Sequence, residues 1–241
     1  MNADYSKIEE ITSSKVDVNH NIRYDTILNI FQDLATAHAT QMGMSFTALK
    51  ENCNAFWVLS KIRFLLKGSI RQFDVLTSKT WPLKPTAFRF NRDFILHGNS
   101  GEVLGSSEWC VLDIDSGRLR QFSSLNYPND LQHLTARSNA GEFNKFFIEI
   151  SESDLIYTYT AQFCDIDCNG HVNNVSYGKM ALNVFTPKEF VNYNFTGFEI
   201  HFISQTYFGN QIKIYKKQLE NGVYVEGRLN DKAVFKAKFE Y

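Results

Sequence analysis

The sequence predicts an α+β protein built from two similar units, each with one helix and an antiparallel β-sheet. The composition favours sheets with bulky interiors, because 44% of the 241 residues are hydrophobic and 15% are aromatic, with few Gly and Pro. In both halves a helical pattern precedes a run of strand patterns. A shift of 150 residues also aligns part of the first half with part of the second.

The first half is predicted to contain one long helix followed by strands. From Tyr24 to Met42 apolar side chains recur at the spacing of one helical face, and Gly43 is placed to end this helix. Beyond it the pattern alternates, as in strands, with turn residues between the runs. The predicted strands cover residues 54–67, 73–81, 87–97 and 103–114.

The second half repeats this order after a polar connection from Ser123 to Lys145. A helix is predicted over residues 173–185, ending before Pro187. The predicted strands cover residues 146–150, 157–163, 198–207, 211–219, 223–229 and 233–241. The domains are therefore predicted at residues 1–135 and 136–241.

The repeat is seen best just before each helix. With the shift of 150, Asp17 aligns with Asp167, Asn19 with Asn169 and Asn21 with His171. A duplicated unit in which a curved antiparallel sheet wraps around one helix is called a hotdog, so the prediction is a tandem hotdog. At the aligned position an ionisable imidazole is present only in the second copy, which is where we expect any chemistry.

Composition also limits the partners and the location. The formal net charge is −1, which provides no overall field to attract nucleic acid or an anionic membrane. No apolar run approaches the roughly 20 residues of a membrane-spanning helix. The four cysteines show no disulfide framework spacing and the N-terminus shows no signal-peptide pattern, so we expect a cytoplasmic protein.

The stretch DIDCNGHVNNVS, residues 165–176, has the beginning of an EF-hand calcium loop. The twelfth position should be a bidentate carboxylate but is Ser176, and a strand pattern precedes the loop where a helix is required. A cysteine nucleophile or a zinc site is also disfavoured, because Cys168 alternates away from His171 and no second ligand pair follows. We therefore expect neither a metal nor a cofactor.

The same stretch suits acid–base chemistry. In an extended chain Asp167, Asn169 and His171 project to one side, bringing a carboxylate, an amide and an imidazole together. Histidine exchanges protons near neutral pH, and the free N–H groups of the first helical turn, from His171 to Asn174, favour developing negative charge. Because Asp and Asn before a helix are also common turn formers, the residues alone leave both interpretations open.

The stretch DIDCNGHVNNVSYG resembles the active-site motif D-x-N-x-H-V-N-N-x-x-Y of the acyl-acyl-carrier-protein (acyl-ACP) thioesterases, with Asp167, Asn169, His171 and Tyr177 in register. Stretches of the first half are similar to signatures of this family in the same order: FQDLATAHATQMG, FWVLSKIRF, Thr80-Trp81, FNRDFIL and SEWCVLDIDSGRLRQ. The resemblance implies a tandem hotdog enzyme that hydrolyses the thioester between a fatty acyl chain and the phosphopantetheine of its carrier protein. It also implies that residues 1–135 hold the acyl chain and that the catalytic motif belongs to residues 136–241.

One position departs from the family pattern. The family has a glutamate on the strand after the motif helix, and this chain has Gln205 there. Gln205 cannot act as a general base, so proton transfer is expected to fall on Asp167 and His171, with the Gln205 amide positioning water. The predicted catalytic residues are Asp167, Asn169, His171 and Gln205.

The implied partner is an acidic acyl carrier protein. Basic residues of the first half are candidates for a local docking patch, or else for a solvated strand face: Lys61, Arg63, Lys67, Arg71, Arg89 and Arg92. Two other functions remain open, hydrolysis of acyl-CoA thioesters and non-catalytic acyl binding. The sequence leaves open the acyl chain length and the oligomeric state, a homodimer included.

Overall fold

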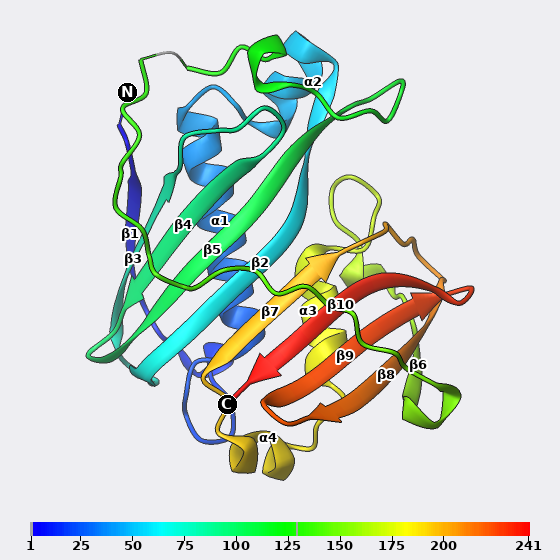
Figure 1. Ribbon diagram of the computed structural model, residues 1–241. Helices are drawn as coiled ribbons and strands as arrows, with labels where there is room; N and C mark the ends of the chain where they lie inside the picture. The colour runs from blue at the N-terminus through cyan, green and yellow to red at the C-terminus, as the bar shows by residue number, and fades with distance from the viewer. Residues whose placement is uncertain (1, 129) are drawn as a thin grey trace. The chain divides into compact units, whose positions relative to one another are not determined.

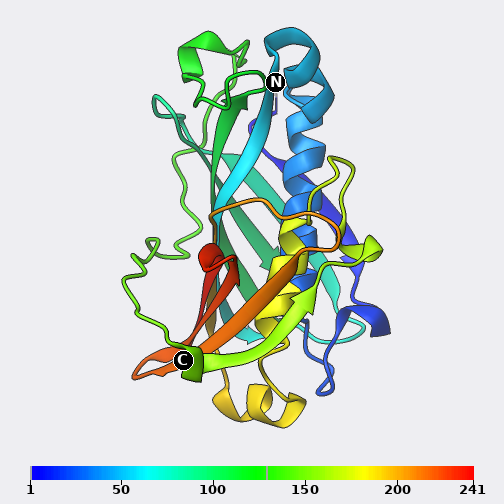
Figure 2. The ribbon, with the colours of Figure 1, turned by 90° about the vertical axis from the view of Figure 1, so that its right-hand side faces the viewer.

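The computed structural model describes residues 2–128 and 130–241 and divides the chain into two compact units, Met1–Ala140 and Gly141–Tyr241. Within each unit the strands are antiparallel, and a helix lies along one face of these strands (Figures 1 and 2). This is the α+β hotdog arrangement that the sequence predicts for each half.

The sheet of the first unit has the strand order β1-β3-β4-β5-β2, with antiparallel neighbours throughout. Its strands are β1 (Tyr5–Glu10), β2 (Ala55–Ser69), β3 (Val75–Pro82), β4 (Phe90–His97) and β5 (Ser100–Asp113). The helices are α1 (Tyr24–Gln41) and α2 (Phe46–Cys53), and short 3-10 turns lie at Ser13–Lys15 and Phe122–Ser124. The sequence did not predict α2 as a separate element.

Helix α1 packs its apolar face against the sheet of the first unit. Phe31 is buried and stacks on Phe94 of β4 with ring centroids 4.2 Å apart. On β5, a Cβ atom at Gly105 would lie 2.2 Å from the Phe31 ring, so only glycine admits the ring there. The helix ends as predicted, because Gly43 adopts the left-handed conformation at φ +68°.

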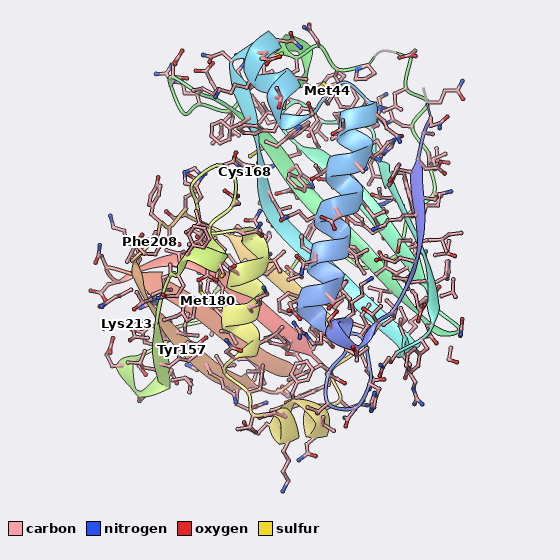
Figure 3. All side chains as sticks on the ribbon, turned by 180° about the vertical axis from the view of Figure 1, so that it is seen from behind. Met44, Tyr157, Cys168, Met180, Phe208 and Lys213 are labelled. Carbon is pink, nitrogen blue, oxygen red and sulfur yellow. The ribbon has the colours of Figure 1, made fainter. Side chains whose placement is uncertain are left out.

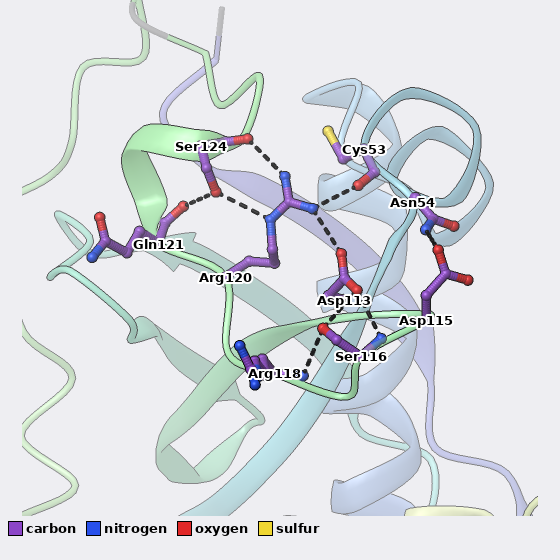
Figure 4. Close-up of polar contacts among 9 residues, drawn as sticks. All are labelled: Cys53, Asn54, Asp113, Asp115, Ser116, Arg118, Arg120, Gln121 and Ser124. Atoms are coloured by element: carbon purple, nitrogen blue, oxygen red, sulfur yellow. Dashed lines mark hydrogen bonds and ion pairs between the residues drawn. The ribbon is translucent and has the colours of Figure 1, made fainter.

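The turn after β5 is held by Arg120 (Figure 4). Its Nη1 donates to the backbone oxygen of Cys53 at 3.0 Å and to Oδ2 of Asp113 at 3.1 Å, while its Nε donates to Oγ of Ser124 at 3.2 Å. The guanidinium thereby joins the end of α2, the end of β5 and the 3-10 turn that follows.

The last residues of the first unit run along the sheet face that α1 does not cover. Ala136 accepts a hydrogen bond from Nε1 of Trp81 at 2.9 Å, and Ala140 accepts one from Nε of Arg63 at 2.8 Å. Arg63 is therefore buried, and so is Arg92 on the inner face of β4. These two arginines cannot belong to an exposed docking patch, which corrects that part of the expectation.

The sheet of the second unit has the order β7-β10-β9-β8-β6, again antiparallel. Its strands are β6 (Leu155–Thr160), β7 (Gly197–Phe202), β8 (Gln211–Leu219), β9 (Gly222–Leu229) and β10 (Lys232–Glu240). The helices are α3 (Asn174–Leu182) and α4 (Pro187–Tyr193), with 3-10 turns at Glu152–Asp154 and Phe163–Asp165. Tyr177 of α3 packs its ring against Phe202 and Phe235 of the sheet.

Two predictions for the second half were wrong, and one helix was missed. Residues 146–150 form no strand; Phe146 instead packs on His201 of β7 at 4.5 Å, and the nearby Asn144 donates to Glu199. Strand β7 ends at Phe202 rather than at residue 207. Helix α4 was not predicted, although Pro187 at its first turn and the reciprocal capping by Thr186 and Glu189 are its sequence signals.

Of the helices in the part of the chain that the structure describes, none is both long enough and apolar enough to cross a membrane.

Candidate active site

The motif of the second unit forms a tight loop between β6 and α3. Ile166 and Val172 pair as an isolated bridge, and the N–H of Asp167 donates to the oxygen of His171 at 2.8 Å. Gly170 turns the chain at φ +78°. The backbone from 167 to 171 is therefore a turn and not an extended strand, so the expected one-sided projection by alternation is wrong.

The Asp167 carboxylate is used inside this turn. Its Oδ1 accepts the N–H of Asn169 at 2.8 Å and, more weakly, the N–H of His171 at 3.4 Å. The Nδ2 of Asn169 approaches Oδ2 at 3.5 Å. Asp167 and Asn169 thus come together, with Asn169 exposed and Asp167 half-buried, and they shape the loop that carries His171.

The His171 ring is half-buried and meets an aromatic neighbour that the sequence analysis missed. Tyr207 packs against it in a T-shaped contact with centroids 5.1 Å apart. Among the described residues the imidazole has no hydrogen-bond partner, so the Asp167 carboxylate does not orient it in this structure. The only sequence signal for Tyr207 is its place two residues after Gln205.

The N–H groups from His171 to Asn174 were expected to be free, but among the described residues only that of Asn174 lacks a partner. Val172 donates to the oxygen of Thr206 at 2.9 Å, and Asn173 donates to the oxygen of Asp165 at 2.7 Å. Asn173 also caps α3, because its side chain accepts the N–H of Val175 at 2.8 Å. Within the described residues the N–H of Asn174 has no partner, so it is the donor left for a ligand.

Gln205 lies on the segment that joins β7 to β8, residues 203–210. Its side chain is exposed and makes no hydrogen bond to the described residues. The residue beside it, Thr206, is fully buried and fixes this segment to the motif loop. The structure therefore brings the segment of Gln205 to the loop, while the side chain found against His171 is that of Tyr207.

Glu199 and His201 do not take part in this site. They alternate with the buried Phe198 and Ile200 along β7, so they occupy the other face of the strand. There Oε1 of Glu199 lies 2.6 Å from Nε2 of His201, and Asn144 donates to the same carboxylate. Neither residue therefore takes the place of a base at position 205.

The first unit contains the same loop, with Asn21 in the place of His171. Asp17 donates its N–H to Asn21 at 2.8 Å, and its Oδ1 accepts from Asn19 at 2.8 Å. Ile22 donates to the oxygen of Ile70 at 2.9 Å, as Val172 does to Thr206. The alignment at a shift of 150 is thus confirmed within the loop, and the turn itself does not require the histidine.

Among the described residues, the cysteines and acidic side chains form no metal site. Cys164 and Cys168 are exposed and free, and Cys168 lies on the motif loop (Figure 3). In residues 2–128 and 130–241 no group of three or more His, Cys, Asp or Glu side chains is arranged to hold a metal ion. The described loop carries an imidazole, the Asn169 amide and the Asn174 N–H, which are groups suited to acid–base chemistry.

Comparison with known families matches both units. A family model described as the acyl-ACP thioesterase N-terminal domain matches residues 3–124, and one described as its C-terminal domain matches residues 148–237. A chloroplastic acyl-acyl-carrier-protein hydrolase of Cuphea viscosissima is 24% identical over 178 residues, covering 69% of this chain and 43% of the relative. Oleoyl-acyl carrier protein thioesterase 1 of Arabidopsis thaliana is 26% identical over 200 residues, covering 76% and 54%. The chain spans about half the length of these relatives.

Solved structures show the same fold. A crystal structure described as an acyl-ACP thioesterase from Bacteroides thetaiotaomicron has a TM-score of 0.83 at 21% identity, covering 99% of this chain and 97% of that one. The 12:0-ACP thioesterase from Umbellularia californica has a TM-score of 0.84 at 15% identity, covering 100% and 97%. At these identities the likeness establishes the hotdog fold and not a substrate.

Proposed function

This chain belongs to the acyl-ACP thioesterase family, and from that membership we propose that it hydrolyses fatty acyl-ACP to a free fatty acid and the carrier protein. Water supplies its oxygen to the acyl carbon and the thiol of the phosphopantetheine leaves with a proton. The observation that supports the proposal is the His171 loop, which carries a half-buried imidazole in a unit that matches the C-terminal family model.

In this proposal His171 performs the proton transfers. The neutral imidazole takes a proton from the attacking water and returns it to the leaving thiolate. Asp167 holds the turn that presents the ring.

The carbonyl oxygen becomes negative when water adds. In this proposal the N–H of Asn174 and the exposed amide of Asn169 donate hydrogen bonds to this oxygen. Removing one such donor in other enzymes costs about 2.7 to 4 kcal/mol of transition-state stabilisation. Gln205 completes the proposed set by holding the water through its amide, since its own side chain has no partner among the described residues.

Binding of the acyl chain is assigned to the first unit, residues 1–135. A buried cluster at one end of that unit combines aromatic rings with methionines, which adapt their shape readily: Met42, Met44, Leu49, Ala55, Phe90, Val111, Leu125, Tyr127 and Leu131. The carrier protein is the proposed partner. A homodimer and a cytoplasmic location stay predictions.

The experiment that tests the function is fatty acid release from matched acyl-ACP and acyl-CoA substrates over a range of chain lengths. We expect higher kcat/KM for the carrier-linked substrate by at least about tenfold, since the carrier surface adds binding. Hydrolysis of acyl-CoA alone would assign the chain to coenzyme A thioesters. Tight acyl-ACP binding without hydrolysis at any pH would show an acyl-binding protein instead of an enzyme.

A further inference from the structure

Thr206 is a buried residue between two exposed ones, Gln205 and Tyr207. All of its polar groups are used. Its N–H donates to the hydroxyl of Tyr177 at 3.0 Å, its Oγ1 lies 2.8 Å from the same hydroxyl, and its carbonyl oxygen accepts the N–H of Val172 at 2.9 Å. One residue thereby joins the 203–210 segment to both α3 and the motif loop.

The other partner, Tyr177, is held firmly in the core of the second unit. It is 3% exposed, and its ring packs against Phe202 and Phe235. Burial raises the pKa of Tyr177, so the phenol stays neutral. A neutral phenol has one hydrogen and two lone pairs, so it can accept from the Thr206 N–H while it shares its own hydrogen with Oγ1.

The first unit shows that the loop folds without these hydroxyl groups. At the shift of 150 Tyr177 corresponds to Ile27, and the residue in the place of Thr206 is Ile70, because Ile22 donates to its oxygen. Both isoleucines are buried. The backbone bond is kept in both units, whereas the hydroxyl pair occurs in the unit that has the histidine.

From this difference we infer that Tyr177 and Thr206 are positioning residues, which hold Gln205 and Tyr207 in place at His171. The inference rests on the proposed function. Tyr207 contacts the imidazole ring directly, and Gln205 is the other neighbour of Thr206. A shift of Thr206 therefore moves both side chains relative to the imidazole, although Tyr177 and Thr206 touch no reacting atom.

The test compares Tyr177→Phe with Tyr157→Phe. Tyr157 of β6 also bonds α3 through its hydroxyl, which donates to the oxygen of Met180 at 2.6 Å, but it is not linked to the 203–210 segment (Figure 3). We expect Tyr177→Phe to lower kcat on acyl-ACP about tenfold with KM nearly unchanged, because small misplacement of catalytic groups is costly. Tyr157→Phe should leave kcat within about twofold of the wild type.

The Thr206 side chain is tested in the same assay. Thr206→Val keeps the shape and loses Oγ1, so it should lower kcat as Tyr177→Phe does, and the double variant should be no worse than the single ones. Thr206→Ser keeps the hydroxyl that Thr206→Val removes, so its kcat should stay close to that of the wild type. Equal loss in the Tyr157 and Tyr177 variants would overturn the inference, since it would show a general loss of packing.

A second readout does not depend on turnover. The ring-proton NMR signals of His171 report its contact with Tyr207, and amide exchange at Thr206 reports the link itself. Both should change in Tyr177→Phe and Thr206→Val and stay as in the wild type in Tyr157→Phe. Unchanged His171 signals and Thr206 exchange in the first two variants would overturn the inference. A wild-type protein without hydrolysis would overturn the proposed function, and these signals would still decide whether the pair positions the loop.

Discussion

At the scale of single residues, His171 is what distinguishes the second loop from the first. Asp167 and Asn169 have counterparts, Asp17 and Asn19, that make the same bonds in a unit without the imidazole. The sequence motif identified all three residues of the second loop, yet it could not show that the carboxylate bonds backbone N–H groups and not the imidazole. Tyr207 was missed because its contact with His171 depends on the course of the 203–210 segment.

Gln205 provides the sharpest test of a single side chain. Gln205→Glu places a carboxylate, with an ordinary pKa of about 4.3, where the amide holds water in the proposed mechanism. We expect turnover of acyl-ACP at neutral pH to rise severalfold, because a general base is added, and the gain to disappear below about pH 4 as the carboxylate is protonated.

Gln205→Ala is the control for this change, measured by the same initial rates. It should lower turnover, because the polar group that holds water is lost. Rates equal to the wild type in both variants would rule out a role for position 205.

At the scale of elements, the helices and strands with clear periodicity were predicted and the short helices were not. Helix α1 and the long β2 have sustained apolar patterns, whereas α2 and α4 are short and are marked mainly by their caps. Residues 146–150 were predicted as a strand. Instead, the ring of Phe146 packs on His201, and the side chain of Asn144 donates to Glu199. The bond between Val172 and Thr206, which closes the site, has no sequence signal at all.

The two equivalent loops allow a matched comparison of stability and activity. Asp17→Ala and Asp167→Ala each remove a carboxylate that accepts backbone N–H groups of its turn. Hydrogen bonds to charged groups contribute about 1.5 to 3 kcal/mol, and for these accessible loops we expect a loss of about 1 to 2 kcal/mol in unfolding free energy in each variant.

Only Asp167→Ala should also lower turnover of acyl-ACP. Urea denaturation and initial rates on the same preparations measure the two effects. If Asp17→Ala reduced turnover as strongly as Asp167→Ala, the assignment of the chemistry to the second loop would fail.

At the scale of the whole molecule, the chain is a duplicated unit, and the proposed function gives its two copies separate roles. The duplication was visible from a few aligned residues because both loops need the same turn formers. The bond between Tyr177 and Thr206 and the contact between His171 and Tyr207 could not be predicted, since each joins positions about 30 residues or more apart.

The stability of the molecule should depend on the protonation of His38 in the first unit. His38 is 1% exposed, and its Nδ1 lies 3.0 Å from Nη1 of Arg92. Burial and the charge of Arg92 lower the pKa of His38 to about 4, so the folded state keeps a neutral imidazole. The unfolded imidazole, with a pKa near 6.5, takes up its proton first, so the free energy of unfolding should fall by up to about 3 kcal/mol from pH 6.5 to pH 4.

Urea denaturation at several pH values measures this dependence. His38→Gln should remove its share of the slope between pH 6.5 and pH 4, because the amide can accept from Arg92 without titrating. His97→Gln, which changes an exposed histidine, is the control and should keep the slope. Equal slopes in the wild type and His38→Gln would contradict the buried neutral imidazole.

The most direct test of the account exchanges the residue that differs between the two loops. His171→Asn gives the second loop the residue that Asn21 provides in the first, so folding should be kept and the denaturation midpoint should stay close to that of the wild type. In hydrolysis of acyl-ACP we expect kcat to fall by about 100-fold or more, since general acid–base catalysis contributes about 10² to 10⁴ in rate. A folded His171→Asn protein that hydrolyses acyl-ACP within twofold of the wild-type rate would contradict the central claim.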